Sequence, residues 1–170
     1  MRKPGFWFAA LLLGLIMFGG SCAKGPSRDE QEIRGLEDRF AAAVRAKDID
    51  SIMKGYAPGA ELFVFDVTPP RQHVGFDDYK KDWQDFFAAF PGPVDKFEVQ
   101  ELSIETDGKL AYSHSIQPLI ITRKDSSKFS FTVRVTDGYR KVNGKWVITQ
   151  EHVSVPVDLA TSKPDLASKP

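Results

Sequence analysis

A histidine and an aspartate near the C-terminal end of the chain are placed to cooperate in proton transfer. Asn143-Gly144 is the dipeptide most typical of a two-residue hairpin turn, so the segments on either side should pair as antiparallel strands. Because side chains alternate along a strand, that pairing puts Asp137 and His152 on one face. An imidazole oriented by a carboxylate can act as a general acid or base. We therefore predict Asp137 and His152 as candidate catalytic residues.

The same pairing assigns the neighbouring side chains to two faces. Gln150 and Ser154 share the face of His152 and are predicted to contact a ligand. Arg134 and Glu151 fall on the opposite face, where they can form a structural ion pair outside any pocket. A one-residue bulge in the hairpin would exchange the two faces.

A helix from 76 to 90 carries the densest aromatic pattern of the chain. Its aromatic residues fall at helical spacing. They are Phe76, Tyr79, Trp83, Phe86, Phe87 and Phe90. Most of such a stripe is core, but Trp83 has a polar atom that can reach a ligand, as has Tyr56 outside the helix. We predict both as ligand contacts.

The remaining elements follow an order of helices first and strands later. Ser27 and Glu30 form a capping box for a helix over 28–47, and a shorter helix is expected over 49–56. Period-two segments indicate strands. These cover 60–66, 95–106, 109–123, 128–142 and 145–156. This layout predicts an α+β domain with an antiparallel meander.

The other histidines do not form a metal-binding pattern. His73 lies in a loop and is expected to be exposed, whereas His114 shares a strand face with Tyr112, and both Tyr112 and His114 are predicted to contact a ligand. The chain contains no H-x-H or H-x-x-x-H spacing. We expect neither a metal ion nor another cofactor.

The first 22 residues resemble a bacterial signal peptide. Arg2 and Lys3 precede an apolar run over 6–18, which is too short for a permanent membrane helix. The sequence Gly-Gly-Ser-Cys resembles a lipobox, so Cys22 is predicted to be lipidated. Ordinary cleavage after Ala23 is the alternative. Lipidation would place the protein in the cell envelope, anchored on the periplasmic or extracellular face.

Charge and composition limit the possible partners and divide the chain. The chain has 23 basic and 23 acidic residues and no basic stripe, which gives no indication of nucleic-acid binding. A single cysteine leaves no internal disulfide. We divide the chain into a signal peptide (1–22), a linker (23–28), one domain (29–157) and a Lys-, Pro- and Ser-rich tail (158–170) expected to be disordered.

Three segments resemble the SnoaL-like domains of the NTF2-like superfamily. Segment 38–64 resembles the family's opening helices and first strand, and 69–83 resembles its loop and third helix. Segment 133–156 contains Gly-Lys-Trp followed by His-x-Ser, as in the closing hairpin of SnoaL-like domains. The resemblance implies a cone in which N-terminal helices pack in a strongly bent antiparallel sheet. It also implies a homodimer formed through the outer face of the sheet.

The resemblance also suggests roles for individual residues. Asp66 corresponds to the general base of ketosteroid isomerase, and burial at an apolar cone mouth would raise its pKa; the alternative is a loop residue that caps Thr68. Asp137 is similar to the second acid of that enzyme, but Phe40 stands where its tyrosine donor would be, which argues against steroid isomerase activity. His114 falls at a pocket position in several relatives, and the alternative is a satisfied histidine of the sheet.

These observations support three hypotheses about function. The first is an exported, lipid-anchored pocket domain that binds a small apolar or mixed ligand without chemistry. The second is an enzyme of the isomerase, cyclase or dehydratase type without cofactor, which would use Asp66 or the His152–Asp137 pair for proton transfer. The third is an interaction module for other envelope proteins. The fold by itself does not choose among them.

Overall fold

A computed structural model of the chain describes residues 25–167, so the predicted signal peptide and Cys22 lie outside the described part. The helices are α1 (Arg28–Ala46), α2 (Ile49–Met53) and α3 (Phe76–Ala89), with a short 3-10 turn η1 (Gly59–Glu61). The first strands are β1 (Phe63–Phe65), β2 (His73–Val74), β3 (Val94–Phe97) and β4 (Gln100–Thr106). They are followed by β5 (Leu110–Thr122), β6 (Lys128–Val142), β7 (Lys145–Ser154), β8 (Val157–Asp158) and β9 (Lys163–Pro164).

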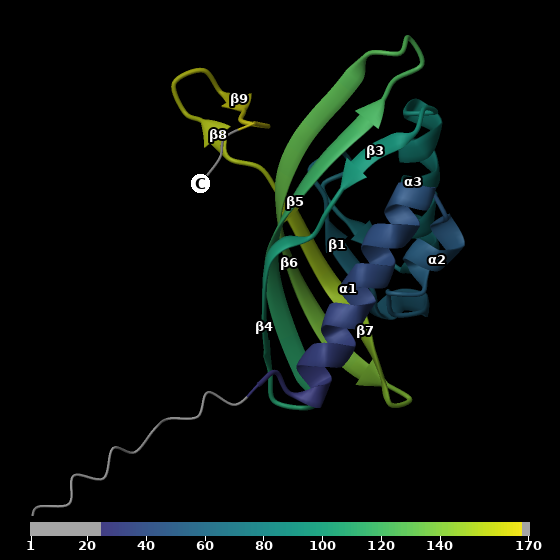
Figure 1. The fold of residues 1–170 in the computed structure, drawn as a ribbon, viewed down its shortest axis with the longest axis vertical. Coiled ribbons are helices and arrows are strands. Elements are labelled where there is room, and N and C mark those ends of the chain that lie inside the picture. Colours follow the sequence, from purple (N-terminus) through teal and green to yellow (C-terminus); the bar gives the residue numbers. More distant parts are fainter. Residues whose placement is uncertain (1–24, 168–170) are drawn as a thin grey trace, which may run out of the picture.

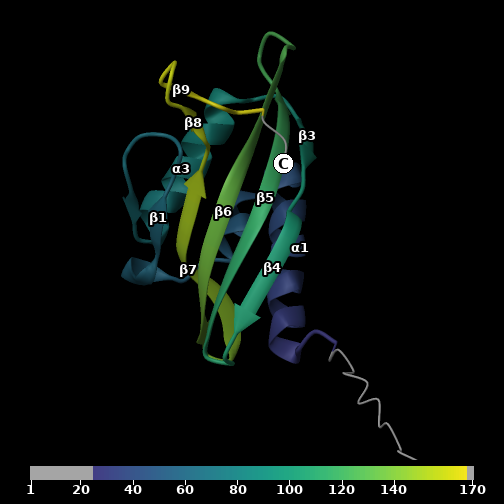
Figure 2. The same ribbon diagram turned by 90° about the vertical axis from the view of Figure 1, so that its left-hand side faces the viewer.

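A strongly curved sheet holds the helices on its concave face (Figure 1). Its strand order is β2-β1-β7-β6-β5-β3, and β4 also pairs with β5. When the molecule is turned, the long strands β5, β6 and β7 stand in front and α1 runs behind them (Figure 2). All pairs in this sheet are antiparallel except β1 with β7, which run parallel. The expected α+β cone is confirmed, but its sheet is mixed and not wholly antiparallel.

Helix α1 begins and ends where its flanking residues satisfy free backbone groups. Ser27 Oγ accepts a hydrogen bond from the Glu30 amide (3.1 Å) at the start of the helix. At the other end Lys47 adopts a left-handed conformation, and its amide donates to the carbonyls of Ala43 and Val44. These two caps explain why the observed helix agrees with the predicted one to within a residue.

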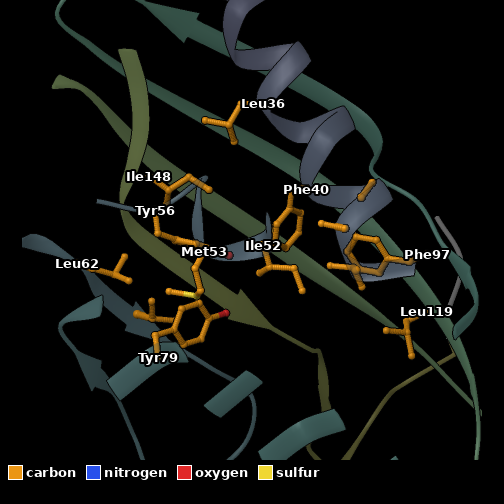
Figure 3. Packing of buried hydrophobic residues seen from close by; sticks show 14 of the residues in the cluster. Leu36, Phe40, Ile52, Met53, Tyr56, Leu62, Tyr79, Phe97, Leu119 and Ile148 are labelled. Carbon is orange, nitrogen blue, oxygen red and sulfur yellow. The ribbon is translucent and has the colours of Figure 1, made fainter. Parts of the chain in front are cut away.

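The hydrophobic core lies between the helices and the concave face of the sheet. In Figure 3, Phe40 of α1 and Ile52 of α2 lie with Phe97 of β3 and Leu119 of β5. The ring of Phe40 makes edge contacts with Tyr56, Trp83 and Phe97. An aromatic core of this kind is stabilised by apolar burial and by edge-to-face ring contacts.

The hairpin of β6 and β7 contains a bulge that changes which side chains face the core. From the Asn143-Gly144 turn, pairing proceeds as predicted as far as Tyr139 opposite Ile148. The next pair is Gly138 with Gln150, so Thr149 is an extra residue on β7. From that point every β7 side chain is on the face opposite to the predicted one, because a strand alternates with a period of two.

Two further segments differ from their predicted structure. The strand expected over 95–106 is divided into β3 and β4, and Glu101 has a φ of 53° beside an irregularity in the pairing of β4. The tail expected to be disordered forms the β8–β9 hairpin, and the Leu166 carbonyl accepts a hydrogen bond from the Thr132 amide of β6 (3.0 Å). Among the described helices, none is both long and apolar enough to cross a membrane.

Candidate ligand-binding site

A cavity of about 310 Å³ lies between α3 and the concave face of the sheet. One wall is the aromatic face of α3, which contributes Tyr79, Trp83, Phe86 and Phe90. Side chains from α1 and the sheet complete the lining. These include Phe40, Phe97, Gln117, Leu119, Phe131, Val133, Val135 and Val153. Such a volume with mostly apolar walls is at the lower end of the range for small-molecule sites.

The cavity is polar at one side and apolar at the other. Asp66 follows β1 and Glu151 comes from β7, which is the neighbour of β1 in the sheet. Phe97 and Leu119 come from β3 and β5, at the other edge of the same sheet. The strand order therefore separates a carboxyl-lined side from an aromatic and aliphatic side.

Glu151 is the most deeply buried acid of the cavity wall, with only 4% of its surface exposed. Its two carboxyl oxygens accept hydrogen bonds from the hydroxyls of Tyr79 (2.5 Å) and Tyr56 (2.8 Å). Burial raises the pKa of Glu151 to about 7, although these two hydrogen bonds favour its charged form. The carboxyl can therefore gain or lose a proton near neutral pH within reach of a bound molecule.

More acidic groups lie behind Glu151, in the interior of the domain. Asp137 on β6 is directly opposite Glu151, and burial together with the charge of Glu151 raises its pKa well above the usual range. The hydroxyl of Tyr139 donates to Glu37 of α1 (2.7 Å) and lies 2.8 Å from Ser113 Oγ. Burial raises the pKa of Glu37 to about 7. Glu151 thus stands between the cavity and the buried carboxyl of Asp137.

Asp66 lies at the mouth of the cavity. Its Oδ1 accepts hydrogen bonds from the amides of Val67 and Thr68, so it also has the loop-capping contacts considered as an alternative role. Burial nevertheless raises the pKa of Asp66. Nearby Asp82 of α3 also lines the cavity. Its pKa is raised, mainly by burial and to a smaller extent by the charge of Asp66.

Within residues 25–167, no three His, Cys, Asp or Glu side chains are arranged to hold a metal ion.

Only some of the predicted site residues come together. Asp66 and Trp83 line the cavity, and the Trp83 Nε1 atom is buried without a hydrogen-bond partner among the described residues. Tyr56 and Asp137 do not line it, although both adjoin Glu151. The placement of Tyr56 in the core leaves its hydroxyl to act through Glu151.

The predicted positions of four ligand contacts and of one catalytic residue are wrong. Gln150, His152 and Ser154 follow the Thr149 bulge and lie on the convex face, where His152 packs against the ring of Phe65. The predicted pairing of His152 with Asp137 therefore does not occur. On β5, Tyr112 and His114 also point outward, because Ser113, Ser115 and Gln117 take the inward positions.

The prediction that Glu151 lies on the outer face with Arg134 is also wrong, because it assumes a hairpin without this bulge. Arg134 is exposed, whereas Glu151 is buried and bonded to two tyrosines. A glycine inside a strand often marks a bulge, so Gly138 was the available signal for this shift. His73 also differs from its expected exposure, since it is buried on β2 and its Nε2 lies 3.6 Å from Asp82 Oδ1.

Comparisons with known proteins agree with the fold. A family profile described as SnoaL-like domain matches residues 33–158. An NTF2-like protein of unknown function from Pseudomonas putida KT2440 is 33% identical, with a TM-score of 0.74, over 83% of this chain and 96% of that chain. No curated protein matches the chain significantly.

Two more distant structures share the fold. A ketosteroid isomerase-like protein from Erwinia carotovora atroseptica SCRI1043 is 18% identical, with a TM-score of 0.63, over 75% of this chain and 96% of its own. An NTF2-like superfamily protein from Salmonella enterica serovar Typhimurium LT2 is 16% identical, with a TM-score of 0.67, over 76% of this chain and 92% of its own. The profile match and the Pseudomonas protein together show that this chain belongs to the SnoaL-like family of the NTF2-like superfamily.

Proposed function

We propose that this protein binds a small, mainly apolar molecule in the cavity between α3 and the sheet. The observation that carries the proposal is the lining itself, in which aromatic rings form the wall and Tyr79 and Glu151 supply polar contacts at one side. The apolar body of the ligand lies against Phe90 and Phe97, and its polar end meets Glu151. Burial of apolar surface provides the affinity, and the few polar groups fix the orientation.

The proposal is tested by native mass spectrometry of the protein purified from its own host. A retained small molecule is the expected result. In the variant Val153→Phe, a larger side chain at the cavity wall should displace that molecule. The matched control is Val74→Phe, which adds the same ring at an exposed position of β2 and should retain the ligand. Equal occupancy in both variants would contradict the assignment of the cavity.

A second candidate function is proton transfer to or from the bound molecule. It is favoured by the position of Glu151, a carboxyl with a pKa of about 7 that lines the cavity and contacts a tyrosine hydroxyl. The hydrogen bond that the Tyr79 hydroxyl donates to Glu151 favours the charged form of this carboxyl, which is the form that can accept a proton. Glu151→Gln would remove turnover while retaining ligand binding if this function is correct, and would leave any turnover intact if it is not.

We also propose that the protein is exported and anchored through a lipid on Cys22. The proposal is supported by the basic start, the apolar run and the Gly-Gly-Ser-Cys sequence. Cys22→Ser should move the protein from the membrane fraction to the soluble fraction of the envelope. A wild-type protein that is already soluble would contradict the anchor.

A further inference from the structure

We propose that the ligand of the α3–sheet cavity is an organic cation: an aromatic or aliphatic body with a protonated amine at the end that meets Asp66, Asp82 and Glu151. This inference rests on the proposed binding function and specifies the chemical class of the ligand. It is carried by the distribution of charge around the cavity and by the nature of its walls.

Every charged side chain that lines the cavity is acidic. Asp66, Asp82, Asp85 and Glu151 contribute to the lining, whereas no lysine, arginine or histidine within residues 25–167 does so. Two basic groups approach these acids from outside the lining: Lys81 pairs with Asp85, and His73 Nε2 lies 3.6 Å from Asp82 Oδ1. The carboxylates that line the cavity would repel a negatively charged ligand and attract a cation.

Three of the four cavity acids, Asp66, Asp82 and Glu151, have no lysine or arginine partner among the described residues, whereas Asp85 pairs with Lys81. On the surface, Asp29 pairs with Lys141, and Asp95 pairs with Lys128. Neither Asp66 nor Glu151 forms such a pair within the described part of the chain, and the charge of Asp66 acts unfavourably on Glu151. A bound ammonium group would supply the missing positive charge and relieve this repulsion.

The walls next to these acids suit the rest of such a ligand. Trp83 and Phe86 line the cavity on the helix that carries Asp82, so aromatic rings adjoin the carboxyl-lined side. Aromatic faces attract cations as well as apolar groups, and this attraction strengthens where water is excluded. The same chain uses such contacts elsewhere, for example Lys47 over the ring of Phe87.

A neutral ligand that accepts a hydrogen bond from protonated Glu151 is the competing possibility. Glu151 alone would favour it, since this carboxyl is half protonated near pH 7. Asp66 and Asp82 decide in favour of the cation, because both line the cavity and both are only partly buried. A cation can interact with both of these acids as well as with Glu151.

The test compares ligands that differ only in their polar group. Isothermal titration calorimetry at pH 7 would use 1-naphthylmethylamine, 1-naphthylmethanol and 1-naphthoate, and then octylamine, octanol and octanoate. In at least one series we expect the amine to bind about tenfold or more tighter than the alcohol, and the carboxylate most weakly. Equal affinity of amine and alcohol would overturn the charge inference but leave the binding function intact. Absence of binding in both series would count against both proposals.

Variants of the protein provide the matched control. The double change Asp66→Asn and Asp82→Asn should bring the affinities of amine and alcohol to within about threefold, mainly by weakening the binding of the amine. The same variant should melt at a higher temperature than wild type, because two like charges are removed. Asp77→Asn removes an equal charge from an exposed position of α3 outside the cavity and should preserve the preference for the amine. Loss of that preference in the control would show a general effect of net charge.

Discussion

At the scale of single residues, the unusual feature is a set of buried acids with tyrosine partners. Glu37, Asp137 and Glu151 are each almost fully buried, and burial raises the pKa of all three. The native protein therefore binds protons more tightly than the unfolded chain at these positions. The contribution of each group to stability is complete below its unfolded pKa, about 3.9 for the aspartate and about 4.3 for the glutamates, and is lost as the pH rises through its folded pKa.

This sign predicts that stability falls between about pH 4.5 and 8. For Glu151 the difference between about 7 and its ordinary pKa corresponds to roughly 3 kcal/mol as an upper bound. Glu151→Gln stays neutral at every pH, so its free energy of unfolding, measured by urea denaturation, should depend less on pH in this range. Glu61→Gln removes an exposed glutamate and should give a curve parallel to wild type. A wild-type curve that rises over the same range would contradict the burial of these carboxyls as acids.

At the scale of elements, the Thr149 bulge decides which residues of β7 serve the cavity. It directs the side chain of Glu151 toward the cavity and the side chain of His152 toward the convex face of the sheet. His152→Ala should therefore change the free energy of unfolding by less than about 0.5 kcal/mol and leave ligand affinity unaltered. A marked loss of binding in this variant, measured by calorimetry, would show that the predicted regular hairpin is the correct one.

A second prediction at this scale concerns the connection between α3 and β3, which contains Gly92. A Cβ atom on Gly92 would lie 2.3 Å from the Thr122 carbonyl oxygen, so an alanine cannot fit without displacing backbone. Gly92→Ala should lower the free energy of unfolding by about 1–3 kcal/mol. Gly35→Ala is the matched control, because its Cβ would meet only the flexible end of Arg39 within a helix. That change should be neutral or stabilise by up to about 1 kcal/mol.

At the scale of the whole molecule, the convex face of the sheet is the expected dimer interface. Leu110 and Tyr112 are about half exposed on β5, and His114 points in the same direction. Light scattering on the purified protein should give the mass of two chains. Leu110→Glu with Tyr112→Glu should give the mass of one, since charge on an apolar interface disfavours association. Val74→Glu, at an exposed position of β2, should remain dimeric.

A single-chain mass for wild type would contradict the dimer. In that case the outward side chains of β5, such as Leu110 and Tyr112, would face solvent.

Strand β5 places small polar residues inward and larger residues outward: Ser113 and Ser115 are buried, whereas Tyr112 is about half exposed. Both serines have polar partners in the interior: Ser113 Oγ lies 2.8 Å from the Tyr139 hydroxyl, and Ser115 Oγ accepts a hydrogen bond from Gln117.

The sequence by itself determined the main helices and long strands, their order and the family. Three signals involve only residues close along the chain: the Ser27 cap, the aromatic spacing of α3 and the Asn143-Gly144 turn. The structure that each favours can therefore be predicted from the local sequence. The resemblance then placed these elements in a cone, and Asp66 and Trp83 do line its cavity.

Only the tertiary structure decided which side of each strand faces inward. One extra residue, Thr149, reverses the face of every later β7 side chain, and it stands where β7 begins to pair with β1 as well as with β6. The burial of Glu151 likewise depends on hydroxyls supplied by Tyr56 and Tyr79, which are distant in sequence. Such partners offset the free-energy cost of burying a carboxyl, and their convergence is a property of the fold and not of any local pattern.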